Sequence, residues 1–144
     1  MSDPLTAAVP YALPGLDTLL GLQIVTAGPD RVVLRWTVRP DLLQPYGILH
    51  GGVHCAAVEA AASAGAAIWY GERGKVVGVS NQTDFFRAVR EGELTATAIP
   101  LHRGRSQQVW QVTVTDTDGR LTARGQVRLQ NLSGDGVNRS PAGD

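Results

Sequence analysis

Apolar and polar residues alternate along much of the second half of this chain. One segment, 107–115, places three large apolar residues on the same side of an extended backbone: Trp110, Val112 and Val114. In a second segment, 121–130, every odd-numbered position is apolar or small. A period of two is typical of a strand with one buried face. The intervening Asp118-Gly119 favours a tight turn, so the two segments predict a β-hairpin.

Further strands are expected on both sides of a long helical segment. Residues 22–38 alternate around a Gly-Pro-Asp turn, and one face carries Val32, Leu34, Trp36 and Val38. Segments 75–86 and 94–101 are also read as strands, separated by a turn at Glu91-Gly92-Glu93. Residues 39–50 hold two prolines and a glycine, which predicts an irregular loop.

The pattern changes between Gly51 and Tyr70, where alanine dominates. Alanine has the highest helix propensity, so this segment predicts a helix of about 20 residues and roughly 30 Å. The glycines of 71–74 are expected to end it. One long helix followed by four antiparallel strands predicts an α+β fold in which a sheet wraps around the helix.

Length and composition narrow the function classes. The 144 residues fit one domain, which we expect over 1–132, followed by a disordered tail over 133–144. Thirteen basic residues balance thirteen acidic ones, so a general nucleic-acid binder is not expected. The single cysteine, Cys55, excludes an internal disulfide and fits a cytoplasmic protein. No signal peptide is expected because the first basic residue is Arg31, and the alanine-rich segment is too mildly apolar for a membrane span.

The start of the helix holds the candidate chemistry. Gly51 and Gly52 leave backbone N–H groups uncovered at the positive end of the helix dipole, which suits an oxyanion. Glu59 lies in an otherwise apolar helix, where a carboxylate needs a partner or a function. The alternative is that Glu59 lies at a solvent edge and the glycines only allow close packing. His50 and His54 have zinc-like spacing, but a third ligand is not evident, so His54 is expected to be packed or at an interface.

The sequence from Gln44 to Val53, Gln-Pro-Tyr-Gly-Ile-Leu-His-Gly-Gly-Val, with an acidic residue nine positions after the histidine, resembles the hotdog-fold acyl-CoA thioesterases. The resemblance is to the branch that contains the phenylacetate-degradation and hydroxybenzoyl-CoA thioesterases. It covers roughly residues 15–131 and includes further matches: Asn81, Phe85-Phe86-Arg87, Glu91-Gly92 and His102-Arg103-Gly104-Arg105-Ser106.

The resemblance implies a role for each matching residue. Glu59 would be the nucleophile or the general base, and the Gly51 N–H would polarise the thioester carbonyl. Gln44 would bind that oxygen or the nucleophile, His50 would fix the loop, and Ser63 would support the carboxylate. Substrate and coenzyme A contacts are implied for six residues: Asn81, Phe86, Arg87, Arg103, Arg105 and Ser106. Many relatives have Asn and Asp where this chain has Gln44 and Glu59, and the Gln/Glu pair favours the aryl-CoA branch.

The resemblance therefore implies a cytoplasmic enzyme without a cofactor or metal that hydrolyses an aryl or small acyl-CoA. Two alternatives remain: a non-catalytic acyl-CoA-binding hotdog domain, and a hotdog hydratase or dehydratase.

Helix geometry adds an expectation about assembly. Gly51 and Glu59 are about 12 Å apart along the helix, too far to act on one thioester. We expect a homodimer, or a tetramer built from two such dimers, in which Gln44, His50 and Gly51 of one chain face Glu59 and Ser63 of its partner.

Overall fold

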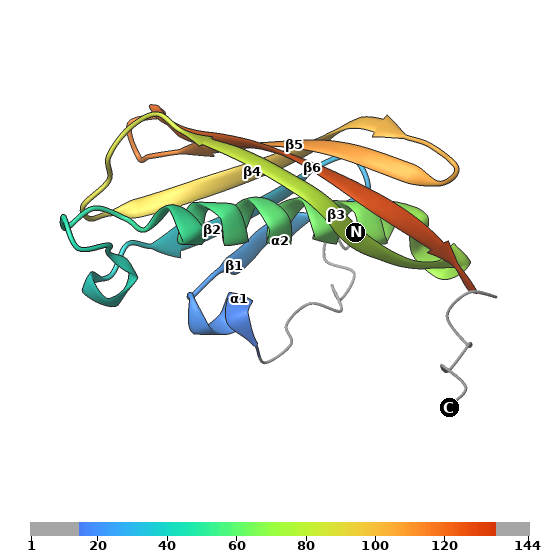
Figure 1. Cartoon of the computed structure of the whole chain (residues 1–144), viewed down its shortest axis with the longest axis horizontal. Helices are drawn as coiled ribbons and strands as arrows, with labels where there is room; N and C mark the ends of the chain where they lie inside the picture. Colours follow the sequence, from blue (N-terminus) through green and yellow to red (C-terminus); the bar gives the residue numbers. More distant parts are fainter. Residues whose placement is uncertain (1–14, 135–144) are drawn as a thin grey trace, which may run out of the picture.

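The computed structural model describes residues 15–134 as a six-stranded antiparallel sheet that curves around one long helix (Figure 1). The helix is α2 (Gly51–Tyr70), and the strand order in the sheet is β1-β2-β4-β5-β6-β3. The strands are β1 (Gln23–Ala27), β2 (Val32–Thr37), β3 (Gly74–Phe85), β4 (Glu93–Arg103), β5 (Gln107–Thr115) and β6 (Leu121–Ser133). The expected α+β architecture, with an antiparallel sheet around a central helix, is confirmed.

Helix α2 begins and ends at the predicted residues, because alanine favours the helix and Gly71 has a φ of 60° just beyond its end. Its small side chains let the sheet come close. A Cβ at Gly65 would lie 2.6 Å from the ring of Trp110, so glycine is required at this crossing. Most alanines of α2 are buried, and together with Leu94, Val112 and Leu129 they form the core.

The predicted inward faces of β5 and β6 are largely confirmed. Trp110, Val112 and Val114 are fully buried, and so are Ala123, Val127 and Leu129. The alternation expected for β6 is wrong at its first two residues: Leu121 is exposed and Thr122 is fully buried. A register shift between Val114 and Thr115 accounts for the difference. The Thr122 hydroxyl then donates to the carbonyl of Val114, which satisfies it inside the core.

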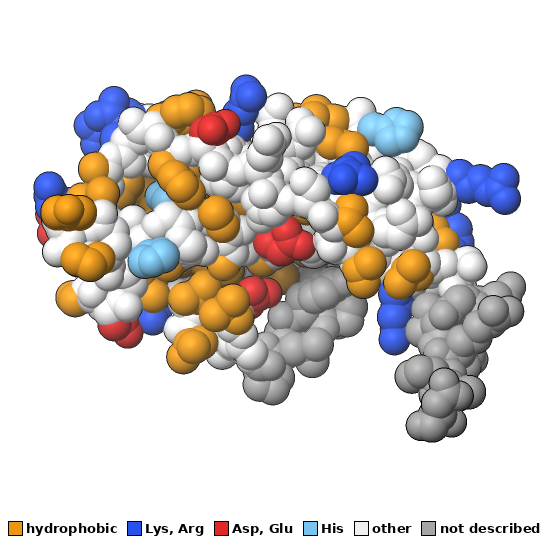
Figure 2. All heavy atoms as spheres, in the orientation of Figure 1, with side chains coloured by type: hydrophobic (Ala, Val, Ile, Leu, Met, Phe, Trp, Pro, Cys, Tyr) orange, Lys and Arg blue, Asp and Glu red, His pale blue; other side chains and the backbone are white. Residues whose placement is uncertain are grey.

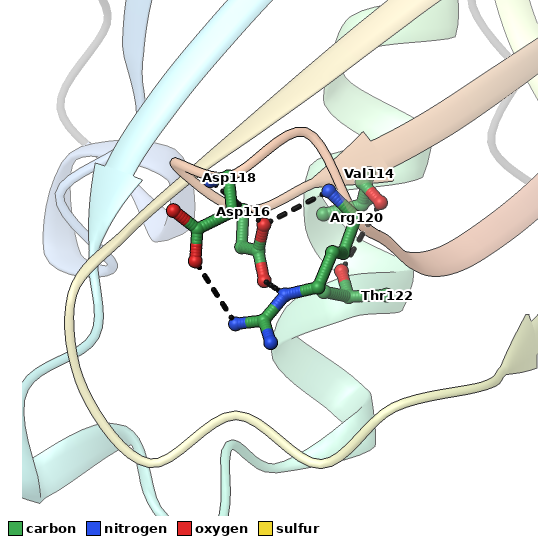
Figure 3. A network of polar contacts seen from close by, with 5 residues as sticks. All are labelled: Val114, Asp116, Asp118, Arg120 and Thr122. Carbon is green, nitrogen blue, oxygen red and sulfur yellow. Dashed lines mark hydrogen bonds and ion pairs between the residues drawn. The ribbon is translucent and has the colours of Figure 1, made fainter.

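The turn that joins β5 to β6 is the predicted Asp-Gly hairpin. Gly119 has a φ of 77°, which favours glycine, and its N–H donates to the Asp116 carbonyl. The Arg120 guanidinium bonds both Asp116 and Asp118, as Figure 3 shows. The N–H and guanidinium of Arg120 hold the pKa of Asp116 below its usual value. This exposed cluster closes the end of the hairpin.

Strand β3 is an edge strand, paired with β6 alone within the described residues. Its register is interrupted between Gly78 and Ser80, and its free edge exposes Val77 and Val79 to 44% and 49%. Exposed hydrophobic side chains also gather on the face shown in Figure 2, toward the end where α2 begins. An exposed apolar edge of this kind is a ready site for pairing with another strand.

Two short elements were not predicted: α1 (Leu16–Leu19) and a 3₁₀ turn, η2 (Pro40–Leu42). A further 3₁₀ turn, η3 (Gly71–Arg73), lies within the predicted helix stop. The segment 22–38 forms two antiparallel strands, β1 and β2, which pair across the Gly-Pro-Asp turn. The expected tail lies outside the described residues except for Ser133 and Gly134, and Ser133 is the last residue of β6. Within 15–134, none of the helices combines the length and apolarity that a bilayer crossing needs.

Candidate active site

At the N-terminus of α2, one backbone N–H has no hydrogen-bond acceptor among the described residues. His50 caps the helix: its Nδ1 accepts from the Gly52 N–H at 2.8 Å, and its carbonyl accepts from the Val53 N–H at 2.9 Å. No described residue accepts from the Gly51 N–H. Because this group lies at the positive end of a 20-residue helix, it is suited to bind a carbonyl oxygen that gains negative charge.

The loop before the helix carries Gln44, which lines the same cavity as Gly51. The Gln44 backbone N–H donates to the Ile48 carbonyl at 2.8 Å, and the side-chain oxygen of Gln44 accepts from the Tyr46 N–H. Arg90 donates to the carbonyls of Tyr46 and Gly47 and ties the loop to the strand β3–β4 connection. With its oxygen occupied in this way, the Gln44 side chain has its amide NH₂ left to donate.

Gln44 and Gly51 line one cavity of about 350 Å³. Phe85, Phe86 and Arg87 form part of its wall, so two of the predicted substrate contacts, Phe86 and Arg87, lie at this cavity. The ring of Phe85 lies directly over Gly51, where a Cβ would approach the ring to 2.9 Å. Glycine at position 51 therefore allows an aromatic ring to lie against the helix start.

Glu59 lies two turns further along α2 and packs against the edge strand. Its Oε2 accepts from the Asn81 amide at 3.2 Å, and the same amide donates to the Cys55 carbonyl at 3.1 Å. Its Oε1 lies against Gly78, where a Cβ would overlap it. Asn81, predicted as a substrate contact, therefore has its amide directed at the Glu59 carboxylate in this structure.

A second cavity, of about 230 Å³, contains Glu59 and Ser63. Its walls are mostly apolar and come from α1, β1, β2, α2 and the α1–β1 connection, including Leu16, Leu22 and Ile24. Asp17 is a further carboxylate in this wall, and burial raises its pKa above the usual value. Glu59 therefore borders a small, mostly apolar space.

The predicted catalytic residues thus fall into two groups within one chain. Gln44 and Gly51 line the first cavity, Glu59 and Ser63 line the second, and none of the residues 15–134 lines both. A single chain brings each group together but does not bring the two groups to one cavity. This separation agrees with the distance expected from helix geometry.

The predicted coenzyme A contacts in the β4–β5 loop differ in their surroundings. Arg103 forms an ion pair with Asp30 at 2.8 Å and donates to the Pro29 carbonyl at 2.8 Å, so its guanidinium anchors the β1–β2 turn. Arg105 is exposed, and its guanidinium has no ion-pair or hydrogen-bond partner in the described part of the chain. Ser106 is exposed, and its carbonyl accepts from the Asn131 N–H.

A buried polar network that sequence reasoning missed supports this loop. Trp110 Nε1 donates to Gln108 at 2.8 Å, and Gln108 donates to Asn131 at 2.8 Å and to the Ala66 carbonyl at 3.2 Å. Asn131 in turn donates to the carbonyls of Gly104 and Arg105. The sequence did contain a signal for this network: Gln108 is a polar residue on the inward face of β5, and a buried polar side chain needs hydrogen-bond partners.

His54 is packed, as predicted, and only 3% of its surface is exposed. Its surroundings were not predicted: it lines the cavity that contains Gly51 and contacts the rings of Trp36 and Phe85. Burial lowers the pKa of His54 to about 4, so the ring is neutral near pH 7. Residues 15–134 contain no cluster of three His, Cys, Asp or Glu side chains that could hold a metal ion.

Known proteins resemble this chain over most of its length. The family model described as "Thioesterase superfamily" matches residues 46–123. A Mycobacterium tuberculosis protein named as an esterase is 52% identical over 132 residues, which cover 90% of this chain and 91% of that protein. The 1,4-dihydroxy-2-naphthoyl-CoA hydrolase of Listeria monocytogenes is 36% identical and covers 74% of this chain and 87% of its own length. The crystal structure of AziG from S. sahachiroi is similar with a TM-score of 0.79 and 62% identity, covering 81% of this chain and 94% of that one.

Proposed function

Because the chain belongs to the thioesterase superfamily, we propose that it hydrolyses an aromatic acyl-CoA to the free acid and coenzyme A, with Glu59 and the Gly51 N–H as the catalytic groups. Family membership makes the chain a hotdog-fold enzyme that hydrolyses thioesters. The proposal concerns the substrate, the residues and the assembly. The observation that carries it is the Gly51 N–H at the start of α2, which has no acceptor among residues 15–134 and lies at a cavity walled by Phe85 and Phe86.

In the proposed reaction, the thioester oxygen accepts hydrogen bonds from the Gly51 N–H and the Gln44 amide. These donors stabilise the negative charge that develops on that oxygen, and one such donor is typically worth about 3–4 kcal/mol. Glu59 either attacks the carbonyl carbon itself or takes a proton from the attacking water. If Glu59 attacks, the C–S bond breaks as a mixed anhydride forms, and water then hydrolyses the anhydride to the free acid and restores the Glu59 carboxylate. If Glu59 acts as the base, water adds to the carbonyl carbon and the C–S bond breaks directly. In both routes the sulfur of coenzyme A leaves as a thiolate, and a proton that water supplies converts it to the thiol.

The aromatic acyl group is supported by two observations. The cavity beside Gly51 has aromatic walls and a volume of about 350 Å³, which is within the usual size range of small-molecule sites. The relative from Listeria monocytogenes is named for an aromatic, naphthoyl-CoA substrate. We propose further that Arg105 contacts the phosphates of coenzyme A, because its guanidinium is exposed and unpaired in the described part of the chain, whereas Arg103 is held by Asp30.

The proposed enzyme is a homodimer with two shared active sites, and a tetramer would be built from such dimers. The Gly51 and Glu59 cavities of one chain have no common wall residue among those described, so a thioester at Gly51 needs a Glu59 from elsewhere. Two antiparallel copies joined along the free edge of β3 would bring the start of one α2 beside the middle of the other. The exposed Val77 and Val79 on this edge support that pairing.

The direct test is release of free thiol from a series of acyl-CoA substrates, by wild type and Glu59→Gln. We expect aromatic acyl-CoAs to be cleaved faster than aliphatic ones, and Glu59→Gln to lower kcat by at least about 10²-fold with little change in KM. Glu72→Gln, an exposed carboxylate beyond the end of α2, is the matched control and should keep its activity. Near-normal kcat in Glu59→Gln would place the chemistry at another residue.

A further inference from the structure

Three successive carbonyl groups of the β4–β5 loop accept hydrogen bonds from one buried asparagine of β6. The Asn131 side-chain amide donates to the carbonyls of Gly104 and Arg105, at 3.0 and 3.3 Å. The backbone N–H of Asn131 donates to the carbonyl of Ser106 at 2.8 Å. Asn131 is only 7% exposed, whereas Arg105 and Ser106 are exposed. The residue that holds the loop therefore lies beneath it, and the loop itself faces solvent.

These bonds set the direction of two backbone N–H groups in the loop. In a planar trans peptide, the C=O of one residue and the N–H of the next point in opposite directions. Since the carbonyls of Gly104 and Arg105 face Asn131, the N–H groups of Arg105 and Ser106 face away from it. Neither N–H group has an acceptor among residues 15–134. Successive N–H groups that face the same side form a binding site for an anion.

The direction of the Asn131 amide is itself fixed from inside the core. The indole nitrogen of Trp110 can only donate, and it donates to the Gln108 side-chain oxygen at 2.8 Å. The Gln108 NH₂ then faces Asn131 and donates to its side-chain oxygen at 2.8 Å. With that oxygen occupied, the Asn131 NH₂ faces the loop carbonyls. A donor-only group at one end therefore fixes the orientation of both amides.

The same network attaches the loop to α2 at a distance from Glu59. Gln108 donates to the carbonyl of Ala66 at 3.2 Å. Ala66 follows Glu59 by seven residues on α2, which is about 10 Å along the helix axis. In coenzyme A, the pantetheine arm separates the sulfur from the phosphates, so the phosphates must bind away from the reacting carboxylate. The exposed Arg105 guanidinium and the outward N–H groups place two kinds of phosphate donor on this loop.

We propose that Asn131 is a positioning residue that holds the β4–β5 loop in the form that binds the phosphates of coenzyme A. The inference rests on the proposed function, because phosphates reach this loop only if an acyl-CoA is the substrate. The N–H groups of Arg105 and Ser106 contact the phosphate oxygens together with the Arg105 guanidinium. Asn131 acts through these groups and does not touch the substrate.

The test measures kcat and KM of Asn131→Leu on an acyl-CoA and on the matching acyl-pantetheine, by thiol release. Leucine has the branching of asparagine and keeps the backbone N–H, but it cannot donate to the carbonyls of Gly104 and Arg105. We expect KM for the acyl-CoA to rise by about tenfold, because charge-assisted hydrogen bonds to the phosphates are lost, while kcat changes less than about twofold. Neither constant should change for the acyl-pantetheine, which lacks the nucleotide phosphates. Asn131→Ser removes the same amide with less change to the core and should show the same difference, so the test stands if the leucine variant fails to fold.

Gln130→Leu is the matched control, because it makes the same substitution one residue earlier in β6. It removes a hydrogen bond to Gln107 but none to the loop carbonyls, so KM for both substrates should stay near wild type. An equal change on both substrates in the Asn131 variants would make Asn131 a residue of the general fold and overturn the inference. An unchanged KM for the acyl-CoA in a folded Asn131 variant would also overturn it, as would equal KM values of the wild type for the two substrates. Each of these results leaves thioesterase activity intact, whereas cleavage of no acyl-CoA by the wild type would overturn the proposed function itself.

Discussion

Glu59 is held by contacts that leave little freedom to its carboxylate. Asn81 donates to one oxygen, and Gly78 lies against the other on the interrupted stretch of β3. Thr83 in turn donates to the Asn81 side-chain oxygen at 2.7 Å, which directs the Asn81 NH₂ toward Glu59. The position of a single carboxylate thus depends on three residues of β3.

Gly78→Ala should impair catalysis by moving this carboxylate. A Cβ at position 78 would overlap Glu59 Oε1, so the side chain has to turn away from its present position. We expect kcat for the best acyl-CoA to fall by about 10- to 100-fold with a smaller change in KM, because misplacement of a reacting group acts on the transition state. Ser80→Ala, on the other side of the register shift, is the control. Full activity in Gly78→Ala would show that the carboxylate position is not fixed by β3.

His54 should make the protein sensitive to acid. Its pKa is lowered from 6.5 to about 4 by burial, so between these values the unfolded chain binds a proton that the folded chain does not. Stability is then lost as the pH falls through this range, by about 2 kcal/mol between about pH 7 and about pH 5. Urea unfolding of wild type and His54→Phe at both pH values measures this: the wild type should lose about that much more stability than the variant. Equal losses would contradict the burial of a neutral histidine.

At the scale of elements, buried side chains of β5 and β6 hold the β4–β5 loop in place through hydrogen bonds. The network of Trp110, Gln108 and Asn131 reaches the carbonyls of Gly104 and Arg105, and it also holds the carbonyl of Ala66 on α2. A fully bonded buried network is rigid. The loop that carries Arg105 is therefore coupled to the C-terminal half of the helix.

Arg105→Ala should weaken binding of coenzyme A substrates. Loss of one charged hydrogen bond is worth about 1.5–3 kcal/mol, so KM for an acyl-CoA should rise by about tenfold or more. The matching acyl-pantetheine, which lacks the nucleotide phosphates, should be unaffected. Arg128→Ala, an exposed arginine of β6, is the control for a general loss of positive charge. An equal effect of Arg105→Ala on both substrates would remove Arg105 from the phosphate contact.

The elements were predictable where one periodicity dominates, and the site only in part. Alanine content and flanking glycines fixed both ends of α2, and alternation identified the inward faces of β5 and most of β6. The reversal at Leu121 and Thr122 escaped prediction because a register shift is a property of two strands together. Asn81 reaches Glu59 only because β3 packs beside α2, so no local pattern of sequence could indicate their contact.

At the scale of the whole molecule, the chain carries two halves of a site that face separate cavities. Mixed dimers test whether the halves meet between chains. Gln44→Ala and Glu59→Gln are each expected to be inactive, and random mixing makes about half of the dimers mixed, each with one intact site of two. Activity should therefore return to about a quarter of wild type after the two variants are refolded together.

Subunit exchange is confirmed independently by mass spectrometry of the mixture. If exchange occurs without any recovery of activity, both halves act within one chain and the shared-site model is wrong. Two copies of the same variant, refolded in the same way, provide the baseline and should stay inactive.

The strand order affects how this protein folds while it is being synthesised. β3 ends at Phe85, but its partner β6 begins only at Leu121, about 36 residues later, which a ribosome takes roughly 2 to 7 s to add. During that time the helix and β3 exist without the strand that holds β3 in the sheet, and both edges of a valine-rich strand are open. The pairing of β3 with β6 can therefore form only after β6 has been synthesised. A nascent chain stalled in this interval would expose the unpaired edges of β3, which can pair with strands of other chains. Such a chain would depend on chaperones to avoid aggregation.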